Sequence, residues 1–348
     1  MRALSVVVLV FLAVAAVLAV EPISTAPAGQ PLALPGVTGG IGFDDLQLSG
    51  SGMVLVPGGR TGELFVVDPK SRGVSAIGGF SPTSGPFAGG HGEGITSVAD
   101  AGGRLYVTDR TSVSLLVVDP VSKAIVARTK LTASPDYVRW VASRREVWVT
   151  EPDKDQIEVF SVSAKDGPDA APVHAALIPI PGGPESLVVD AARGRAFTHL
   201  WTGKTLALDI AGRSVAARWD NHCQASRGIA LDQTSGRVFA ACSEGRVVTL
   251  DAVHDGRILG ELQTSANGVD IVDYDPARHH LYVPGGKSAS LATVAVAPDG
   301  SLTELGKSAS PASGHCVVSD RQGRAYVCDP PGGRLVVFED RYPAVAWP

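Results

Sequence analysis

CVVSDRQGRAYVCDP, residues 316–330, contains two short apolar runs on either side of a polar turn. Runs of this length, rich in β-branched and aromatic residues and bounded by Asp, Gly or Pro, are typical of β-strands. Asp320 and Arg324 enclose three residues, and the glycine among them suits the left-handed position that such a loop requires. The stretch therefore predicts a β-hairpin.

The same hairpin pattern recurs along the chain. The copies are TSVADAGGRLYVTDR (96–110), YVRWVASRREVWVTEP (137–152), ESLVVDAARGRAFTHL (185–200), GIALDQTSGRVFAACS (228–243) and VDYDPARHHLYVPGG (272–286), with LQLSGSGMVLVPGGR (46–60) as a more degenerate first copy. The turn-side residues are spaced 43, 47, 42, 43 and 45 apart and are Asp100, Ser143, Asp190, Asp232, Asp275 and Asp320. A fixed period in this range indicates a solenoid, a propeller or an array.

Each unit carries a third apolar run, such as VSLLVVDP (113–120), and usually a weaker fourth, such as AIVARTKL (124–131). Four short strands in each of seven units predict an all-β fold, a seven-bladed β-propeller with four-stranded antiparallel blades. The last unit ends after its third strand, GRLVVFED (333–340), whereas QPLALPGV (30–37) precedes the first unit. We expect this N-terminal segment to pair with the last blade, which closes the ring and removes exposed strand edges.

Four tetrapeptides resemble the signature of a known family. YVTD (106–109), WVTE (148–151), YVPG (282–285) and YVCD (326–329) are similar to the repeat of YVTN-repeat β-propellers, which occur widely in exported bacterial proteins and are distantly similar to NHL propellers. The resemblance covers essentially the whole mature chain and implies the propeller fold. Members of that family do not share one activity, so the resemblance implies no particular reaction.

The N-terminus follows the pattern of a signal peptide. Arg2 precedes a long apolar run, and Val17 and Ala19 suit cleavage after Ala19. An uncleaved membrane anchor is the alternative, because Ala3 to Val20 is barely long enough to span a bilayer. The expected organisation is a signal peptide over 1–19, a linker over 20–29, the propeller over 30–340 and a C-terminal tail over 341–348.

The composition limits the classes of partner that we expect for the protein. Apolar residues make up 45% and charged residues 19% of the 348 residues, as in a globular protein. The net charge of −5, without a concentrated basic run, argues against nucleic acid as a partner. No second hydrophobic span is present, so we expect a monomer without a membrane span after cleavage, located in the periplasm or secreted.

Export to an oxidising compartment favours pairing of the four cysteines. The hairpin register sets Cys316 opposite Cys328, within disulfide range. In the fifth unit the register sets Cys242 opposite Arg227, so a bond between Cys242 and Cys223 requires the preceding loop to fold back. The alternative is free thiols that act with nearby histidines as soft ligands for copper.

The first strand of each blade lies nearest the axis of a propeller, and function usually sits on the face where these strands begin. The end of the second strand lies on the same face. The residues that lead into the first strands are Asp44, Asp45, His91, Glu93, Asp136, Glu185, His222, Arg227, Asp270 and His315, with Arg139 just inside its strand. This charged ring predicts an axial pocket for a small polar ligand, or a surface for a protein or cell-envelope partner.

A metal site built from His91, His222 and His315 is the alternative, as the NHL resemblance implies for a catalytic zinc. It would make the protein a metal-dependent hydrolase or lyase. Acidic residues are also common in the solvated loops at a channel mouth when they have no function there. An interaction module with no pocket is therefore a third hypothesis. His279 and His280 are expected to be solvated in a hairpin turn. We expect a binding protein rather than an enzyme, with no resident cofactor. A bound divalent metal is kept as the alternative.

Overall fold

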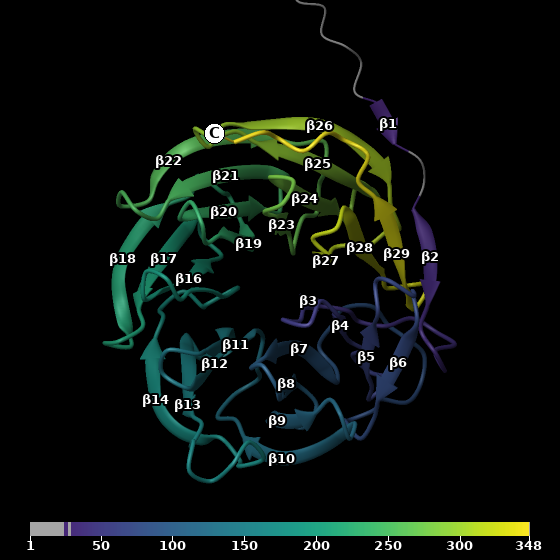
Figure 1. Ribbon diagram of the computed structural model, residues 1–348, viewed down its shortest axis with the longest axis vertical. Helices are drawn as coiled ribbons and strands as arrows, with labels where there is room; N and C mark the ends of the chain where they lie inside the picture. Colours follow the sequence, from purple (N-terminus) through teal and green to yellow (C-terminus); the bar gives the residue numbers. More distant parts are fainter. Residues whose placement is uncertain (1–23, 27–28, 348) are drawn as a thin grey trace, which may run out of the picture.

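The computed structural model describes residues 24–26 and 29–347, so the predicted signal peptide over 1–19 lies outside the described residues. Seven small sheets surround a central axis, and each is antiparallel apart from one strand added to the sixth (Figure 1). The single helical segment in the described part of the chain is a 3₁₀ turn, η1 (Pro152–Lys154). The predicted seven-bladed propeller is confirmed.

The blades follow one another in chain order, each with its first strand nearest the axis and its fourth at the rim (Figure 1). Blade 1 contains β3 (Gln47–Leu48), β4 (Val54–Pro57), β5 (Leu64–Val67) and β6 (Val74–Ile77). Blade 2 contains β7 (Ile95–Asp100), β8 (Leu105–Asp109), β9 (Ser114–Asp119) and β10 (Ala124–Lys130). Blade 3 contains β11 (Val138–Val141), β12 (Glu146–Glu151), β13 (Gln156–Ser161) and β14 (Val173–Pro179).

The second half of the ring repeats this arrangement. Blade 4 contains β15 (Val188–Asp190), β16 (Arg195–Leu200), β17 (Lys204–Asp209) and β18 (Ser214–Asp220). Blade 5 contains β19 (Ser226–Asp232), β20 (Arg237–Cys242), β21 (Arg246–Asp251) and β22 (Arg257–Gln263). Blade 6 contains β23 (Asp273–Asp275), β24 (His280–Gly285), β25 (Ser290–Val296) and β26 (Leu302–Ala309). Blade 7 contains β27 (Val317–Ser319), β28 (Arg324–Asp329) and β29 (Arg334–Glu339).

The recurring aspartate of the repeat holds the first turn of its blade closed. The carboxylate of Asp320 accepts hydrogen bonds from the backbone N–H groups of Gln322, at 2.8 Å, and Arg324, at 3.0 Å. An N–H two or three residues further on donates in the same way to Asp100, Asp190, Asp232 and Asp275. A short polar side chain that bonds the backbone just beyond it stabilises a turn. The aspartates that recur with the sequence period therefore mark the turns of these hairpins.

The N-terminal segment closes the ring as predicted. Strand β2 (Gln30–Ala33) pairs antiparallel with β29 and supplies the fourth strand of blade 7. The segment 20–29, expected as a linker, contains a further strand, β1 (Ser24–Ala26), which pairs in parallel with β26 at the rim of blade 6. The N-terminal segment thus joins two neighbouring blades (Figure 1).

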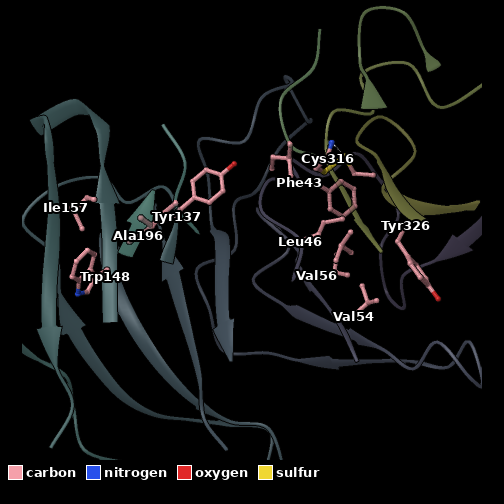
Figure 2. Close-up of a cluster of buried hydrophobic side chains, with 14 of the residues drawn as sticks. Phe43, Leu46, Val54, Val56, Tyr137, Trp148, Ile157, Ala196, Cys316 and Tyr326 are labelled. Carbon is pink, nitrogen blue, oxygen red and sulfur yellow. Dashed lines mark hydrogen bonds between the residues drawn. A yellow bond between two sulfur atoms is a disulfide. The ribbon is translucent and has the colours of Figure 1, made fainter. Parts of the chain in front are cut away.

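Apolar side chains fill the space between blades. Figure 2 shows Trp148, Ile157 and Ala196 from blades 3 and 4 in one group, and Phe43 beside Cys316 in another, at the junction of blades 1 and 7. Neither face of a blade could bury its apolar residues alone, and stacking covers both.

Both predicted disulfides are present. Cys316 and Cys328 have Cα atoms 5.5 Å apart, and their hairpin has the predicted register, with Val317 opposite Val327. Cys223 bonds to Cys242 with Cα atoms 5.2 Å apart, so the loop does fold back. The residue opposite Cys242 is Ser226 and not Arg227, because an irregularity between Ser226 and Ile229 shifts the pairing.

The predicted tail, 341–348, is described to residue 347 and packs against blade 6. The indole of Trp347 stacks on the ring of His279, with centroids 3.9 Å apart, and its N–H donates to a backbone oxygen of β25. His280 is buried, 2.6 Å from the carboxylate of Asp340. The expectation that both histidines are solvated was therefore wrong, because the end of the chain covers their hairpin.

No helix within the described residues is long and apolar enough to cross a membrane.

Candidate functional site: a charged cavity on the axis

A cavity of about 750 Å³ opens on the face where the first strands begin. Seven of the predicted residues line it, one from the loop or strand start of each blade: Asp44, His91, Asp136, Glu185, Arg227, Asp270 and His315. The loops that lead into β7, β11 and the other inner strands bring them together, because every blade presents the same end of its first strand to this face (Figure 1). All seven blades therefore contribute a residue of the predicted axial ring to the wall of one cavity.

The cavity also contains residues that the sequence analysis did not select. Arg110, Trp201, Ser243 and Lys287 line it, and each follows the second strand of its blade by one or two residues. The strand polarity that was used to choose the face already placed the ends of second strands there. The signal was available in the sequence, directly after tetrapeptides such as YVTD (106–109).

Four side chains from blades 1, 2 and 3 form one charged network. Nδ1 of His91 lies 3.0 Å from Oδ2 of Asp44, and a guanidinium nitrogen of Arg110 lies 3.3 Å from the same oxygen. Arg110 also donates to the carboxylate of Asp136 and, at 2.8 Å, to the backbone oxygen of His91. One arginine therefore holds two carboxylates and a histidine together.

Burial and charge drive the pKa values of this network apart. The charge of Asp44 raises the pKa of His91 to about 9, against burial and the charge of Arg110. Burial alone would raise the pKa of Asp44, but the charge and hydrogen bond of His91, with Arg110, hold it below its usual value. Burial raises the pKa of Asp136 well above its usual value despite Arg110. The two carboxyl groups that contact one guanidinium therefore have pKa values shifted in opposite directions.

A second network lies on blades 4 and 5. Oε1 of Glu185 accepts a hydrogen bond from Arg227 at 2.6 Å, and its other oxygen accepts one from the indole N–H of Trp201. The guanidinium of Arg227 also lies over the Trp201 ring, 5.5 Å from its centroid. Burial raises the pKa of Glu185 to about 7, although Arg227 opposes the shift. The half-exposed indole gives this wall a flat apolar surface beside charged groups.

Four predicted residues lie away from the cavity. Asp45 and Arg139 form an ion pair in a second cavity of about 370 Å³ further along the axis, and Tyr137 lines both cavities. Glu93 is more than half exposed and pairs with Arg60 at 3.8 Å. His222 pairs with Glu261 of the rim strand β22 at 2.6 Å.

The predicted set of three metal-binding histidines is not brought together. His222 lies at the rim, two residues beyond the end of the outer strand β18, and pairs there with Glu261 of β22. Asp270 takes its place: one ligand atom each from His91, Asp270 and His315 lie within 4.8 Å of one another. Two imidazoles and a carboxylate suit zinc or a similar divalent ion. Cys316 and Cys328, close to His315, are bonded to each other, so they are not free thiols in this structure.

Comparison with known proteins establishes the fold. No protein-family model matches the chain, and no curated protein matches it. A chain of the mitotic checkpoint complex superposes with a TM-score of 0.73 at 14% identity, covering 97% of this chain and 98% of that one. A chain of hydrazine synthase from Kuenenia stuttgartiensis gives a TM-score of 0.70 at 13% identity, covering 89% and 99%.

The propeller domain of Cps50 (Swd1) from Myceliophteria thermophila is also similar, with a TM-score of 0.69 at 12% identity, covering 87% of this chain and 98% of that one. At identities of 12–14% these likenesses show the fold alone. The argument for a function therefore rests on the cavity.

Proposed function

We propose that the protein is an exported β-propeller that binds a small polar ligand in its axial cavity. One observation carries the proposal: a polar or charged side chain from every one of the seven blades lines the same cavity. Cavities of roughly 300–1,000 Å³ with a few convergent polar groups are the usual form of small-ligand sites. A volume of about 750 Å³ is therefore large enough for a ligand and small enough to enclose one.

The charges of the wall favour a ligand with both donors and acceptors. Arg110, Arg227 and Lys287 present cationic groups, while Asp44 and Asp270 present carboxylates. The paired groups are held by their neighbours, so they are preoriented and lose little entropy when a ligand binds. Trp201 adds an apolar face against which the ring of a sugar or other cyclic ligand could pack.

A thermal-shift screen of sugars, amino acids, quinones and metals, followed by calorimetry on the best ligand, tests the proposal. Replacing Arg227 by Gln should weaken binding about tenfold or more, because a charge-assisted hydrogen bond is lost. Arg246→Gln is the matched control: Arg246 belongs to the same blade, is 36% exposed against 35% for Arg227, and pairs with Glu261 outside the cavity. Equal loss in both variants would contradict the proposal.

Export and membership of the YVTN-repeat family form part of the same proposal. The four signature-like tetrapeptides all lie in second strands, β8, β12, β24 and β28, which end at the face of the cavity. Two disulfides are typical of proteins from oxidising compartments. Intact-mass measurement of protein recovered from the periplasm or medium tests cleavage after Ala19. Retention of the full chain in the membrane fraction would support the anchor instead.

A metal-dependent hydrolase or lyase is the second candidate, and the proximity of His91, Asp270 and His315 favours it. The ring nitrogens of His315 lie 2.8 and 3.1 Å from the backbone oxygens of Ser313 and Phe43, so a metal would displace one of these contacts. Elemental analysis before and after chelator should show one metal per chain, lost in Asp270→Asn and kept in His222→Ala. Metal-free protein that takes up no zinc would exclude this candidate.

A further inference from the structure

A third cavity adjoins the axial one. It encloses about 320 Å³, and its own walls are Phe87, Gly89, Gly90, Pro330 and Pro331. Four residues, His91, Asp270, Ser313 and His315, line both cavities and form the boundary between them. The charged axial cavity therefore continues into a side pocket whose own walls are largely apolar.

The walls of the side pocket are held in place by other parts of the chain. Buried Arg60 donates to three successive backbone oxygens, those of Thr83, Ser84 and Gly85, at 3.3, 3.0 and 2.9 Å, which anchors the loop that carries Phe87. The Phe87 ring lies so close to Gly40 that a Cβ there would come within 2.2 Å of it. The backbone N–H of Ile41 donates to the oxygen of Pro330 at 2.9 Å on the opposite wall. The pocket is thus preformed.

Asp270 differs in its contacts from the other carboxylates that precede first strands and line the axial cavity. Asp44, Asp136 and Glu185 each have an arginine or histidine as an ion-pair partner. The side chain of Asp270 forms no hydrogen bond or ion pair within the described residues, although it is half-buried at the boundary of the two cavities. His91 and His315 approach this carboxylate to within 4.8 Å without forming an ion pair, so its oxygens are still able to accept hydrogen bonds from a cationic group of a ligand.

We propose that the ligand is a small organic amine with an apolar substituent: its ammonium group lies against Asp270, its apolar group fills the side pocket beside Phe87, and its polar remainder lies in the axial cavity. This rests on the proposed function and specifies the ligand class. An ammonium donates hydrogen bonds to a carboxylate and carries the opposite charge. The apolar group gains by leaving water for a preformed apolar pocket.

Benzylamine, benzyl alcohol and methylamine are the probes, titrated by calorimetry into chelator-treated protein. Benzylamine should bind about tenfold or more tightly than benzyl alcohol, which has the same ring and no charge, and more tightly than methylamine, which has no ring. Asp270→Asn should remove the preference for the amine. Asp153→Asn is the control, because Asp153 is an exposed carboxylate on the same axial cavity.

Phe87→Ala should reduce the preference for benzylamine over methylamine, with an unchanged circular dichroism spectrum as the folding check. Equal binding of benzylamine and benzyl alcohol, or an Asp270→Asn variant that keeps the amine preference, would overturn the proposal. If a polar ligand still binds in an Arg227-dependent way while no probe amine binds, this inference fails and the proposed function stands. If no ligand of any class binds the cavity, both fail.

Discussion

At the scale of single residues, the Asp44–His91 ion pair links stability to pH. The pKa of His91 is raised to about 9 in the folded protein, against about 6.5 in an unfolded chain. A raised histidine pKa contributes stability that is complete below about pH 6.5 and is lost as the pH rises through 9. The side chain of His91 is one-third exposed, so solvent screening reduces the gain to roughly 1 kcal/mol.

We therefore expect the free energy of unfolding to fall between pH 6.5 and 9 in the wild type and to change less in Asp44→Asn. Urea unfolding at a series of pH values measures this. His222→Gln is the control, because His222 also contacts a carboxylate but lies exposed at the rim. A wild-type curve that stays flat over this range, after subtraction of the control, would refute the coupling.

Glu185 changes the charge of the cavity in the same direction as His91, but at a lower pH. Burial raises its pKa to about 7, against about 4.5 for a free glutamate, so the folded state favours the protonated form. Stability from this group is complete below about pH 4.5 and is lost as the pH rises through 7. Above pH 7 the cavity gains a negative charge beside Arg227.

Ligand affinity should consequently change between about pH 6 and 8, with cationic ligands bound more tightly at the higher pH. Glu185→Gln should abolish this step, because glutamine keeps the shape and cannot ionise. Calorimetric titrations at several pH values with the same ligand give the comparison. A step of equal size in the variant would assign the titration to another group.

Most of the residues that line the axial cavity on the side of the first strands were predictable, and the exceptions have physical causes. Asp136 and His315 were found because a residue that leads into a first strand must lie at the axis. His222 was misplaced, because it follows the outer strand β18 by only two residues and therefore lies at the rim, before the loop reaches the axis. Arg110 was overlooked even though it follows a second strand that ends on the same face.

At the scale of elements, the hairpin of blade 7 illustrates how a disulfide supports a short strand. Strand β27 has only three residues, and buried Cys316, which is bonded to Cys328, directly precedes its first residue. Register could be counted from the turn in this hairpin because Asp320 fixes the turn geometry. In blade 5 the register counted from the turn was wrong by one residue at Cys242. The irregularity that shifts the pairing lies inside β19, and the turn sequence does not indicate it.

Replacing Cys316 and Cys328 together by Ala should lower the free energy of unfolding by about 2–4 kcal/mol, as expected for a short loop closed by a disulfide. Urea unfolding of the variant and of the wild type under non-reducing conditions measures the difference. Cys223→Ala with Cys242→Ala provides the comparison at a blade that does not close the ring. Retention of wild-type stability in the first variant would show that hairpin packing alone holds the strand.

At the scale of the whole molecule, the ring depends on segments from both ends of the chain. Counting strands predicted β2, because the last blade lacked one. The same count could not predict β1, which adds to a blade that already has four strands. Nor could it predict the contact between Trp347 and His279, since no repeat pattern extends into the tail.

The two N-terminal strands should therefore differ in importance. A protein that begins at residue 29 lacks β1 and keeps a closed ring, so it should remain monomeric with a melting temperature close to that of the longer chain. A protein that begins at residue 35 also lacks β2, which exposes the edge of β29 and uncovers Leu335 and Val337 of the core. An exposed apolar edge strand promotes association, so this shorter protein should melt at a lower temperature and elute as oligomers in size-exclusion chromatography. If both truncated proteins behave alike, the ring is held by the packing between blades and does not require the N-terminal strand.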